Sequence, residues 1–202
     1  MIKIEHLNKK FGDKVVFEDF SLTINDGEFI VLAGKSGCGK TTLLNMLGGI
    51  EPFDSGDIKI NDNSVRCKRF LKEYYLYEVG FLFQNFALIE NKTVRSNIEM
   101  VQKKSRSKYT VEEALDKVNM SDEIDTKVYK LSGGEQQRVA LARLIFKKCN
   151  IILADEPTGS LDRENAQNVM DILKDLNREG KTIVFVTHDE NIIKNSDRVV
   201  ML

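Results

Sequence analysis

The sequence is poor in several features that would place a protein in a special structural class. It contains no tryptophan, two prolines and three cysteines among 202 residues. The two prolines, Pro52 and Pro157, are too few for a proline-rich linker. The cysteines lack metal-ligand spacing and are odd in number, which argues against a disulfide framework and fits a reducing compartment. They are Cys38, Cys67 and Cys149.

A charge excess of one sign and long apolar runs are also absent. The chain has 30 basic and 31 acidic residues, a net charge of −1, so we expect no nucleic-acid partner. Apolar runs such as Phe29–Ala33 hold only about four to six residues, far short of the roughly 20 that a membrane helix needs. The N-terminus has no signal-peptide pattern. With 42% hydrophobic and 30% charged residues, the composition predicts a cytoplasmic globular domain over residues 1–202.

Short apolar segments bounded by turn residues recur along the chain and predict β-strands. Helical patterns separate several of them, including Thr41–Gly48 and the amphipathic segment Asp162–Arg178. Strands that are apolar on both faces and alternate with helices indicate an α/β fold with a mostly parallel sheet. The predicted strands of this sheet are Phe29–Ala33, Val79–Phe83, Ile151–Ala154, Ile183–Val186 and Arg198–Leu202.

Two regions depart from this pattern. Ile2–Leu7 and Val15–Ile24 predict a small antiparallel side sheet, because the second segment alternates between apolar and polar residues after Val16. Residues from about 86 to 148 show mostly helical patterns, which predict a helical subdomain inserted between two strands of the main sheet. We therefore expect a core of residues 1–85 and 149–202. The predicted helices of the insertion are Val94–Val101, Val111–Val118 and Glu135–Lys147.

A glycine-rich loop follows the strand Phe29–Ala33 and matches the pattern G-x-x-x-x-G-K-[ST] in full. Its glycines let backbone N–H groups turn toward phosphate oxygens, and the following helix adds its positive dipole end. Lys40 supplies a cation to the β- and γ-phosphates, and the Thr41 hydroxyl suits Mg²⁺. A glycine-rich turn without a ligand is the alternative. The predicted ATP-binding residues of this segment are Gly34, Lys35, Ser36, Gly37, Cys38, Gly39, Lys40, Thr41 and Thr42.

Polar residues follow three other predicted strands, at the edge of the sheet where ligands bind in such folds. Asp155 suits Mg²⁺ binding through water, and Glu156 suits polarisation of an attacking water. Gln84 can contact both Mg²⁺ and water, and His188 can donate a hydrogen bond to a γ-phosphate. A lone glutamine or histidine at a strand end is more often structural. Gln84 and His188 are therefore catalytic candidates only because they are expected at the same edge as the phosphate loop and the carboxylates. The predicted catalytic residues are Lys40, Gln84, Glu156 and His188, and the predicted metal ligands are Thr41, Gln84 and Asp155.

The segment Leu131-Ser-Gly-Gly-Glu-Gln-Gln137 contains L-S-G-G-x-Q at the start of a predicted helix. This is the signature of the ATP-binding cassette (ABC) family, which the chain resembles over essentially its whole length. The other family elements occur in the expected order: Phe11, the phosphate loop, Gln84, the signature, Asp155-Glu156, Ser160-Leu-Asp162 and His188. The resemblance implies the ABC ATPase form of the P-loop NTPase fold, with ATP and Mg²⁺ as cofactors.

The resemblance also implies a mechanism that uses two chains. Two such domains pair head to tail, and each ATP lies between the phosphate loop of one and the signature of the other. The signature glycines permit close backbone approach, and the Ser132 hydroxyl offers a donor to a γ-phosphate. By this likeness Phe11 stacks on adenine, Asp162 relays between the two sites, and Glu156 keeps hydrolysis intact. The predicted ATP contacts from the signature are Ser132, Gly133, Gly134 and Gln136.

Two details favour one branch of the family. Glu135 in the signature and Gly159 after Glu156 are similar to the lipoprotein-releasing, macrolide-efflux and cell-division branch. The sequence of residues 83–94 and the short C-terminus are similar to those of ATPase subunits of lactococcin-972-type bacteriocin exporters. The resemblance therefore implies an ATPase that powers an exporter of a bacteriocin or peptide, a lipoprotein or a drug.

The implied partners are a second ATPase subunit, which forms a homodimer in the ATP state, and a membrane permease at the inner face of the cell membrane. Phe86, Leu88 and Ile89 are candidates for the permease contact, with packing inside the helical lobe as the alternative. Two other functions stay open: an ATPase driving a signalling or cell-division complex, and a soluble ABC ATPase acting on DNA or ribosomes. The last is disfavoured on two grounds. DNA-repair members separate the two halves of the site by long coiled coils, whereas Lys40 and Ser132 are only 92 positions apart with no heptads between them. Ribosome-acting members usually carry two cassettes in one chain, and this chain has one.

Overall fold

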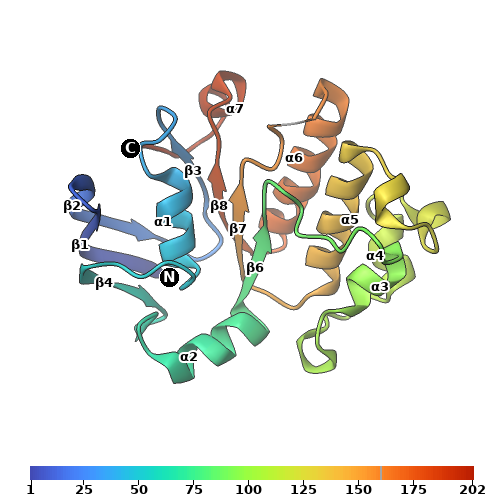
Figure 1. Cartoon of the computed structure of the whole chain (residues 1–202), viewed down its shortest axis with the longest axis horizontal. Helices are drawn as coiled ribbons and strands as arrows, with labels where there is room; N and C mark the ends of the chain where they lie inside the picture. The colour runs from blue at the N-terminus through green and yellow to red at the C-terminus, as the bar shows by residue number, and fades with distance from the viewer. Residues whose placement is uncertain (160) are drawn as a thin grey trace.

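A parallel sheet forms the centre of the structure, a computed structural model that describes residues 1–159 and 161–202. Within those residues it has five strands in the order β6-β7-β8-β3-β9. Every neighbouring pair is parallel, so the carboxyl ends of all the strands lie at one edge. In Figure 1 this is the upper edge. The strands are β3 (Phe29–Ala33), β6 (Val79–Leu82), β7 (Ile151–Asp155), β8 (Thr182–Val186) and β9 (Val199–Met201).

Helices cover both faces of this sheet, and two apolar clusters result. Successive side chains of a strand point to opposite faces. On β3, Ile30 and Leu32 therefore join the cluster that contains α1 (Lys40–Leu47), whereas Val31 and Ala33 join the cluster of the other face. That second cluster contains α5 (Gly133–Phe146) and α6 (Arg163–Arg178). Burial on both faces is the reason why β3, β7 and β8 are almost entirely apolar, whereas β9 at the edge is only partly buried.

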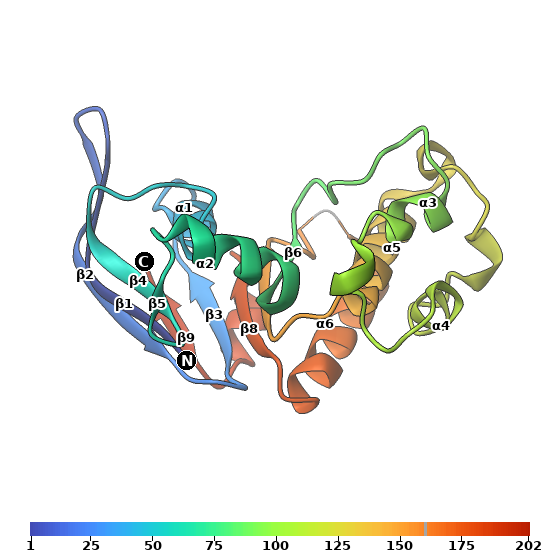
Figure 2. The ribbon, with the colours of Figure 1, turned by 90° about the horizontal axis from the view of Figure 1, so that it is seen from below.

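An antiparallel sheet packs against the α1 side, at the opposite end of the molecule from the helical lobe (Figure 2). Its described strands follow the order β2-β1-β4-β5. The first two were predicted from the sequence and run further than expected: β1 (Ile2–Phe11) and β2 (Lys14–Ile24). The other two, β4 (Ser55–Ile60) and β5 (Asn63–Ser64), were missed. β4 begins with the turn-type residues Ser, Gly and Asp, so its sequence reads as a loop.

The helical lobe is built around α5. Two short helices, α3 (Val94–Glu99) and α4 (Val111–Asp116), pack against it through a shared apolar cluster. Three 3₁₀ turns connect them: η2 (Lys103–Ser105), η3 (Ser121–Glu123) and η4 (Val128–Lys130). Since α5 also packs on the parallel sheet, one helix joins the lobe to the core (Figure 1). α3 and α4 end two residues earlier than the predicted helices.

Three further helical segments were not expected: α2 (Lys68–Glu73), η1 (Tyr74–Glu78) and α7 (Glu190–Lys194). Each has only five or six residues, too few for a helical period to appear in the sequence. Tyr74 is fully buried there, and its hydroxyl donates to the Leu47 carbonyl at 3.2 Å. Burial raises the pKa of this hydroxyl.

Two observations bear on contact with a membrane or its proteins. Among the described residues, no helix has both the length and the apolar composition to cross a bilayer. Phe86 and Leu88 are half-buried and pack against the core cluster, as expected if they pack inside the protein. Ile89 is 42% exposed and stays available for a partner.

Candidate nucleotide site

A cleft of about 820 Å³ opens at the carboxyl edge of the parallel sheet. Its walls come from the β1–β2 hairpin, the loop between β3 and α1, and the ends of β6, β7 and β8. The structure thus brings together most of the residues that were predicted to bind or hydrolyse ATP. The predicted residues that line it are Phe11, Gly34, Lys35, Ser36, Gly37, Gly39, Lys40, Thr41, Thr42, Gln84, Glu156 and His188. Lys14, Val16, Ile193 and Met201, which were not predicted, also line it.

The phosphate loop is held tightly between the side sheet and β9. A Cβ atom on Gly39 would lie 2.5 Å from a methyl carbon of Val16, and one on Gly34 would lie 2.7 Å from the Leu202 carbonyl oxygen. Both glycines have positive φ values, 106° and 149°, which other residues rarely adopt. Gly39 is also the N-cap of α1 and provides no side-chain cap. The first N–H groups of α1 are thus left for an anion.

The Lys40 side chain lies inside this loop. It is 6% exposed, and its ammonium donates to the carbonyl oxygens of Gly34 at 2.9 Å and Lys35 at 3.0 Å. Cys38, within the same loop, lies with its sulfur 3.9 Å from the Lys40 nitrogen and does not line the cleft. These contacts hold a positive charge where the loop would surround a phosphate group.

Thr41 and Asp155 form the oxygen pair expected of a magnesium site. The Thr41 hydroxyl donates to Oδ1 of Asp155 at 3.0 Å. Burial raises the pKa of Asp155, against the opposing effects of the Thr41 hydrogen bond and the Lys40 charge. Mg²⁺ commonly binds through one or two protein oxygens together with phosphates and water. A buried carboxylate beside a hydroxyl fits such an ion, because a divalent cation would offset the cost of burying the carboxylate charge.

Glu156 and His188 meet at the same edge. Nδ1 of His188 lies 2.9 Å from Oε2 of Glu156, a contact that the sequence did not predict. Glu156 has a φ of 43°, an uncommon conformation that costs on the order of 1–3 kcal/mol and recurs at functional sites. Its N–H donates to the Val186 carbonyl at 3.0 Å, which fixes the bend where β7 ends. The carboxylate is thus positioned to accept a proton from water in the cleft.

Phe11 lies at the end of β1, on the wall of the cleft, and is 48% exposed. The Lys9 ammonium lies 4.3 Å from the centre of its ring. That ammonium is fixed by Oε1 of Glu51 at 2.6 Å and the Pro52 carbonyl at 2.7 Å. The Lys9 ammonium contacts the Phe11 ring, and much of the ring surface stays exposed. The exposed surface can therefore stack on a planar base.

The signature residues do not line this cleft. Ser132 is the N-cap of α5, and a Cβ atom on Gly133 would meet no atom within 4 Å. Gln136 folds back, and its amide donates to the Leu131 carbonyl at 3.0 Å. Ser132, Gly133, Gly134 and Gln136 therefore present a separate surface, at the start of the helix that joins the lobe to the core.

Asp162 is also outside the cleft, and Asn165 links it to the signature helix. Asp162 caps α6 by accepting from the Asn165 N–H at 2.9 Å and from its side-chain amide at 2.7 Å. Both bonds lower the pKa of Asp162. The guanidinium of Arg138, on α5, donates to the same Asn165 side chain. Sequence reasoning missed Asn165 and Arg138, since only an N-cap spacing marks the first of them. Ser160, part of the predicted motif, lies outside the described residues.

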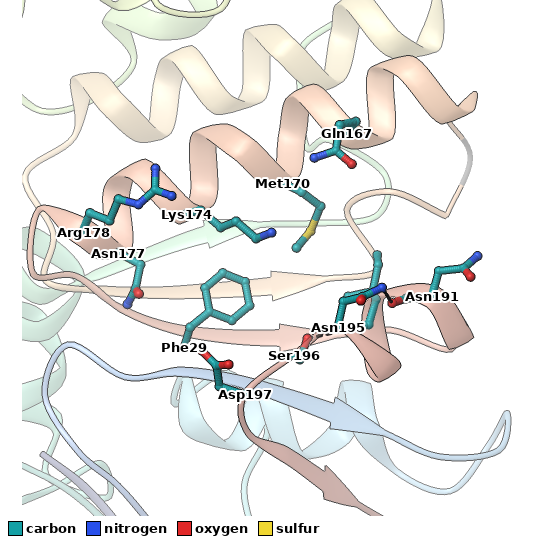
Figure 3. A pocket seen from close by; sticks show the side chains of 11 residues that line it. Phe29, Gln167, Met170, Lys174, Asn177, Arg178, Asn191, Asn195, Ser196 and Asp197 are labelled. Carbon is teal, nitrogen blue, oxygen red and sulfur yellow. Dashed lines mark hydrogen bonds between the residues drawn. The ribbon is translucent and has the colours of Figure 1, made fainter.

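A second cleft, of about 440 Å³, lies between α6 and α7 (Figure 3). Its wall includes Phe29 and Met170 together with polar side chains such as Lys174 and Asn195. It shares no lining residue with the cleft at the carboxyl edge of the sheet. None of the predicted ATP-binding residues lines this second cleft.

Comparison with known proteins agrees with this geometry. The family model described as "ABC transporter" matches residues 17–159. The chain belongs to the ABC transporter family. Its phosphate loop, the Asp155-Glu156 pair and the signature all lie within the matched region, and His188 follows it.

Relatives with different transport roles are similar to this ABC protein. An uncharacterized ABC transporter ATP-binding protein of Bacillus subtilis, YvrO, is 36% identical and aligns over 100% of this chain and 93% of its own length. The glutamine transport ATP-binding protein GlnQ of Bacillus subtilis is also 36% identical, over 100% and 86%. The macrolide export ATP-binding/permease protein MacB of Aggregatibacter actinomycetemcomitans is 36% identical over 99% of this chain. The chain spans only 33% of that longer protein.

A solved structure of a dimeric ATP-binding cassette, MJ0796, in a post-hydrolysis state with ADP and Pi, superposes with a TM-score of 0.88. It is 34% identical and covers 100% of this chain and 94% of its own. These findings confirm the predicted ABC ATPase fold, with its parallel sheet and small antiparallel sheet. They also confirm that the chain is an ATPase with ATP and Mg²⁺ as cofactors. The ABC chain is thus a nucleotide-binding subunit of the transporter family.

Proposed function

We propose that this ABC chain is the ATP-hydrolysing subunit of a membrane exporter and that it works as a head-to-tail homodimer. One observation carries the dimer: Ser132 and Gly133 start α5 on an exposed surface apart from the chain's own cleft. Donors at a helix start suit a phosphate group. A second copy can supply that group, since its phosphate loop presents nucleotide at the edge of its sheet. The dimeric state of MJ0796 supports the pairing of two such chains.

Within each site we assign roles from position. Lys40 holds the β- and γ-phosphates, and Phe11 holds the base. Glu156 accepts a proton from the attacking water, while His188 and Gln84 orient the γ-phosphate and that water. Thr41, Asp155 and Gln84 would hold Mg²⁺, which when bound neutralises charge on the phosphates. The remaining loop residues contribute backbone N–H groups. Across the dimer, Ser132–Gly134 and Gln136 contact the γ-phosphate, and Asp162 relays between the two sites.

Two substitutions test the site that spans two chains. Glu156→Gln should abolish turnover and leave ATP bound, with the dimer visible by sedimentation in ATP and Mg²⁺. Ser132→Arg should keep ATP affinity close to that of the unmodified chain but prevent both dimer formation and hydrolysis, because its bulk occupies the shared surface. Thr110→Arg, at the N-cap of α4, is the matched control and should dimerise normally. A Ser132→Arg variant that hydrolyses ATP at the original rate as a monomer would refute the two-chain site.

A groove of about 480 Å³ is our candidate for the permease contact. It lies where residues before β6 meet the end of α3, at the junction of the proposed core (1–85 and 149–202) and lobe (86–148). Tyr75 and Met100 are exposed in it, surrounded by lysines. Its lining residues are Lys72, Tyr75, Leu76, Met100, Val101, Gln102, Lys104, Ser105 and Lys147. An apolar centre with a basic rim suits a short amphipathic segment that carries acidic residues.

The relative MacB is named as an ATP-binding/permease protein, which supports a permease partner for this chain. Such a partner would place this chain at the inner face of the membrane. Met100→Glu should abolish co-purification with a permease encoded beside this chain and leave the ATPase rate of the isolated chain unchanged. Val15→Glu, at an apolar residue of the β1–β2 hairpin that is 46% exposed against 56% for Met100, serves as the control for added surface charge. Retention of the permease by Met100→Glu would place the contact elsewhere.

The exporter assignment rests on Glu135 and Gly159, which resemble the lipoprotein-releasing and macrolide-efflux branch, and on the likeness of residues 83–94 to bacteriocin exporters. The relatives include both an export and an import protein, so direction needs its own test. Proteoliposomes that contain the chain and its permease should move a labelled peptide, lipoprotein or drug away from the ATP-containing side. ATP-driven movement in the opposite direction would overturn the assignment.

A further inference from the structure

The start of α5 already carries an anion supplied by its own chain. Oε2 of Glu135 accepts from the Ser132 N–H and from the Ser132 hydroxyl, both at 2.7 Å. In return the Glu135 N–H points to the Ser132 oxygen at 3.4 Å. These bonds to Ser132 lower the pKa of Glu135, so the side chain is ionised at neutral pH. The Glu135 carboxylate therefore occupies the N–H and hydroxyl donors of Ser132. In the proposed function these donors bind the γ-phosphate of the partner's ATP.

This arrangement is more than a routine helix cap because it uses the Ser132 hydroxyl proton. A hydroxyl has one proton to donate. While that proton is directed to Glu135, Ser132 cannot donate it to a phosphate. The charge of the nearby Arg138 also lowers the pKa of Glu135, but its guanidinium donates to Asn165 and forms no ion pair with Glu135 within the described residues. A γ-phosphate approaching this surface would meet a carboxylate at close range.

We propose that Glu135 is a positioning residue that weakens the ATP-bound dimer: its carboxylate holds the Ser132 hydroxyl until a partner's γ-phosphate displaces it. This inference rests on the proposed two-chain site. The proposal gives a role to residue 135, the x position of L-S-G-G-x-Q. A neutral side chain of the same shape there would keep the helix cap but would not repel the γ-phosphate. The expected consequence is easier separation of the two subunits, and hence faster exchange between the dimeric and monomeric states.

The helix α4 supplies a matched control. It begins with the same capping arrangement, in which Oε2 of Glu113 accepts from the Thr110 N–H at 2.7 Å and the Glu113 N–H donates to Thr110 at 3.1 Å. Both helices therefore lose a similar capping charge when the glutamate is replaced by glutamine. Only Glu135 lies on the signature. A role confined to helix capping predicts equal effects of the two substitutions on stability and none on the dimer.

The test measures ATP-induced dimerisation by sedimentation in a Glu156→Gln background with ATP and Mg²⁺. Glu135→Gln should strengthen the dimer by about tenfold or more, since one unit of negative charge is lost at each of two sites. Glu113→Gln should leave the affinity unchanged. Because salt screens repulsion, the advantage of Glu135→Gln over the chain that keeps Glu135 should shrink as ionic strength rises. Thermal unfolding of both variants measures the effect of the lost cap itself.

The outcomes separate the two proposals. An unchanged or weaker dimer in Glu135→Gln, together with loss of the dimer in Ser132→Arg, would refute the role of Glu135 and keep the two-chain site. A normal ATP-bound dimer in Ser132→Arg would refute the two-chain site itself. A stronger dimer in Glu135→Gln with the same advantage at every salt concentration would exclude charge as the cause.

Discussion

Replacement of Asp155 by asparagine should stabilise the metal-free protein while removing its response to Mg²⁺. Asp155 is 8% exposed, and its burial disfavours the charged form and raises its pKa. Asparagine keeps an oxygen for the Thr41 hydroxyl, which lies 3.0 Å from Oδ1, so the local hydrogen bond survives. The variant loses the cost of holding a buried charge there, together with the attraction of that charge to Lys40.

The size of the effect follows from these opposing contributions. The Thr41 hydrogen bond and the Lys40 charge offset part of the burial cost, so we expect a net gain of about 1 kcal/mol at neutral pH. In a chain of this length that corresponds to a rise in Tm of roughly 2–4 °C. Because the folded-state pKa is raised, the cost is present above that pKa and is lost as pH falls through it. The advantage of the variant should therefore shrink in acid.

Thermal unfolding in buffer containing a chelator measures the first effect, and the same scan with ATP and Mg²⁺ measures the second. The unmodified chain should gain stability from Mg²⁺ beyond that given by ATP with chelator, and Asp155→Asn should not. Asp175→Asn, an exposed carboxylate on α6, controls for a general change in net charge. A variant that is less stable than the unmodified chain without metal, or that keeps the full Mg²⁺ response, would refute the reasoning.

Three further substitutions probe single contacts. Phe11→Ala should weaken ATP and GTP binding alike by about 1–2 kcal/mol, since a ring stacks on either base; calorimetry showing unchanged affinity would exclude stacking. Tyr74→Phe should lower Tm by roughly 2–4 °C without changing ATP affinity, because the Leu47 carbonyl loses its donor; an unchanged Tm would contradict this. Asn165→Ala should reduce the ATPase rate about tenfold while ATP still binds, because Asp162 is released from Arg138; a normal rate would show that this link is dispensable.

The parts of the fold that a local pattern determines were predictable from the sequence. The strand Phe29–Ala33 is apolar because both of its faces are covered, and the glycine-rich loop after it matches a specific phosphate-binding pattern. β4 could not be recognised in the same way. Its residues Ser55 and Gly56 are typical of turns, and the segment is a strand because it pairs with β1 and β5.

In the candidate site too, some features could be predicted from the sequence and others could not. Residue types at strand ends predicted that Thr41, Asp155, Glu156 and His188 would lie together, because parallel strands end at one edge. The orientation of side chains was not predictable. The contact between His188 and Glu156 depends on the unusual backbone of Glu156, and the Arg138–Asn165 link depends on how α5 crosses α6. Such contacts join residues far apart in the chain and leave no periodic signal.

The position of α5 connects the chemistry of the cleft to the lobe. The helix starts at Ser132 on the exposed signature, packs through Val139 and Leu141 into the cluster beneath the sheet, and ends beside the groove that contains Lys147. A rigid helix transmits displacement along its length rather than absorbing it. If a partner's γ-phosphate draws Ser132 toward it, the same helix must move the lobe and the groove. If the proposed permease contact and the proposed two-chain site both hold, occupancy of the groove and dimer closure over ATP should influence one another, because both would act on α5.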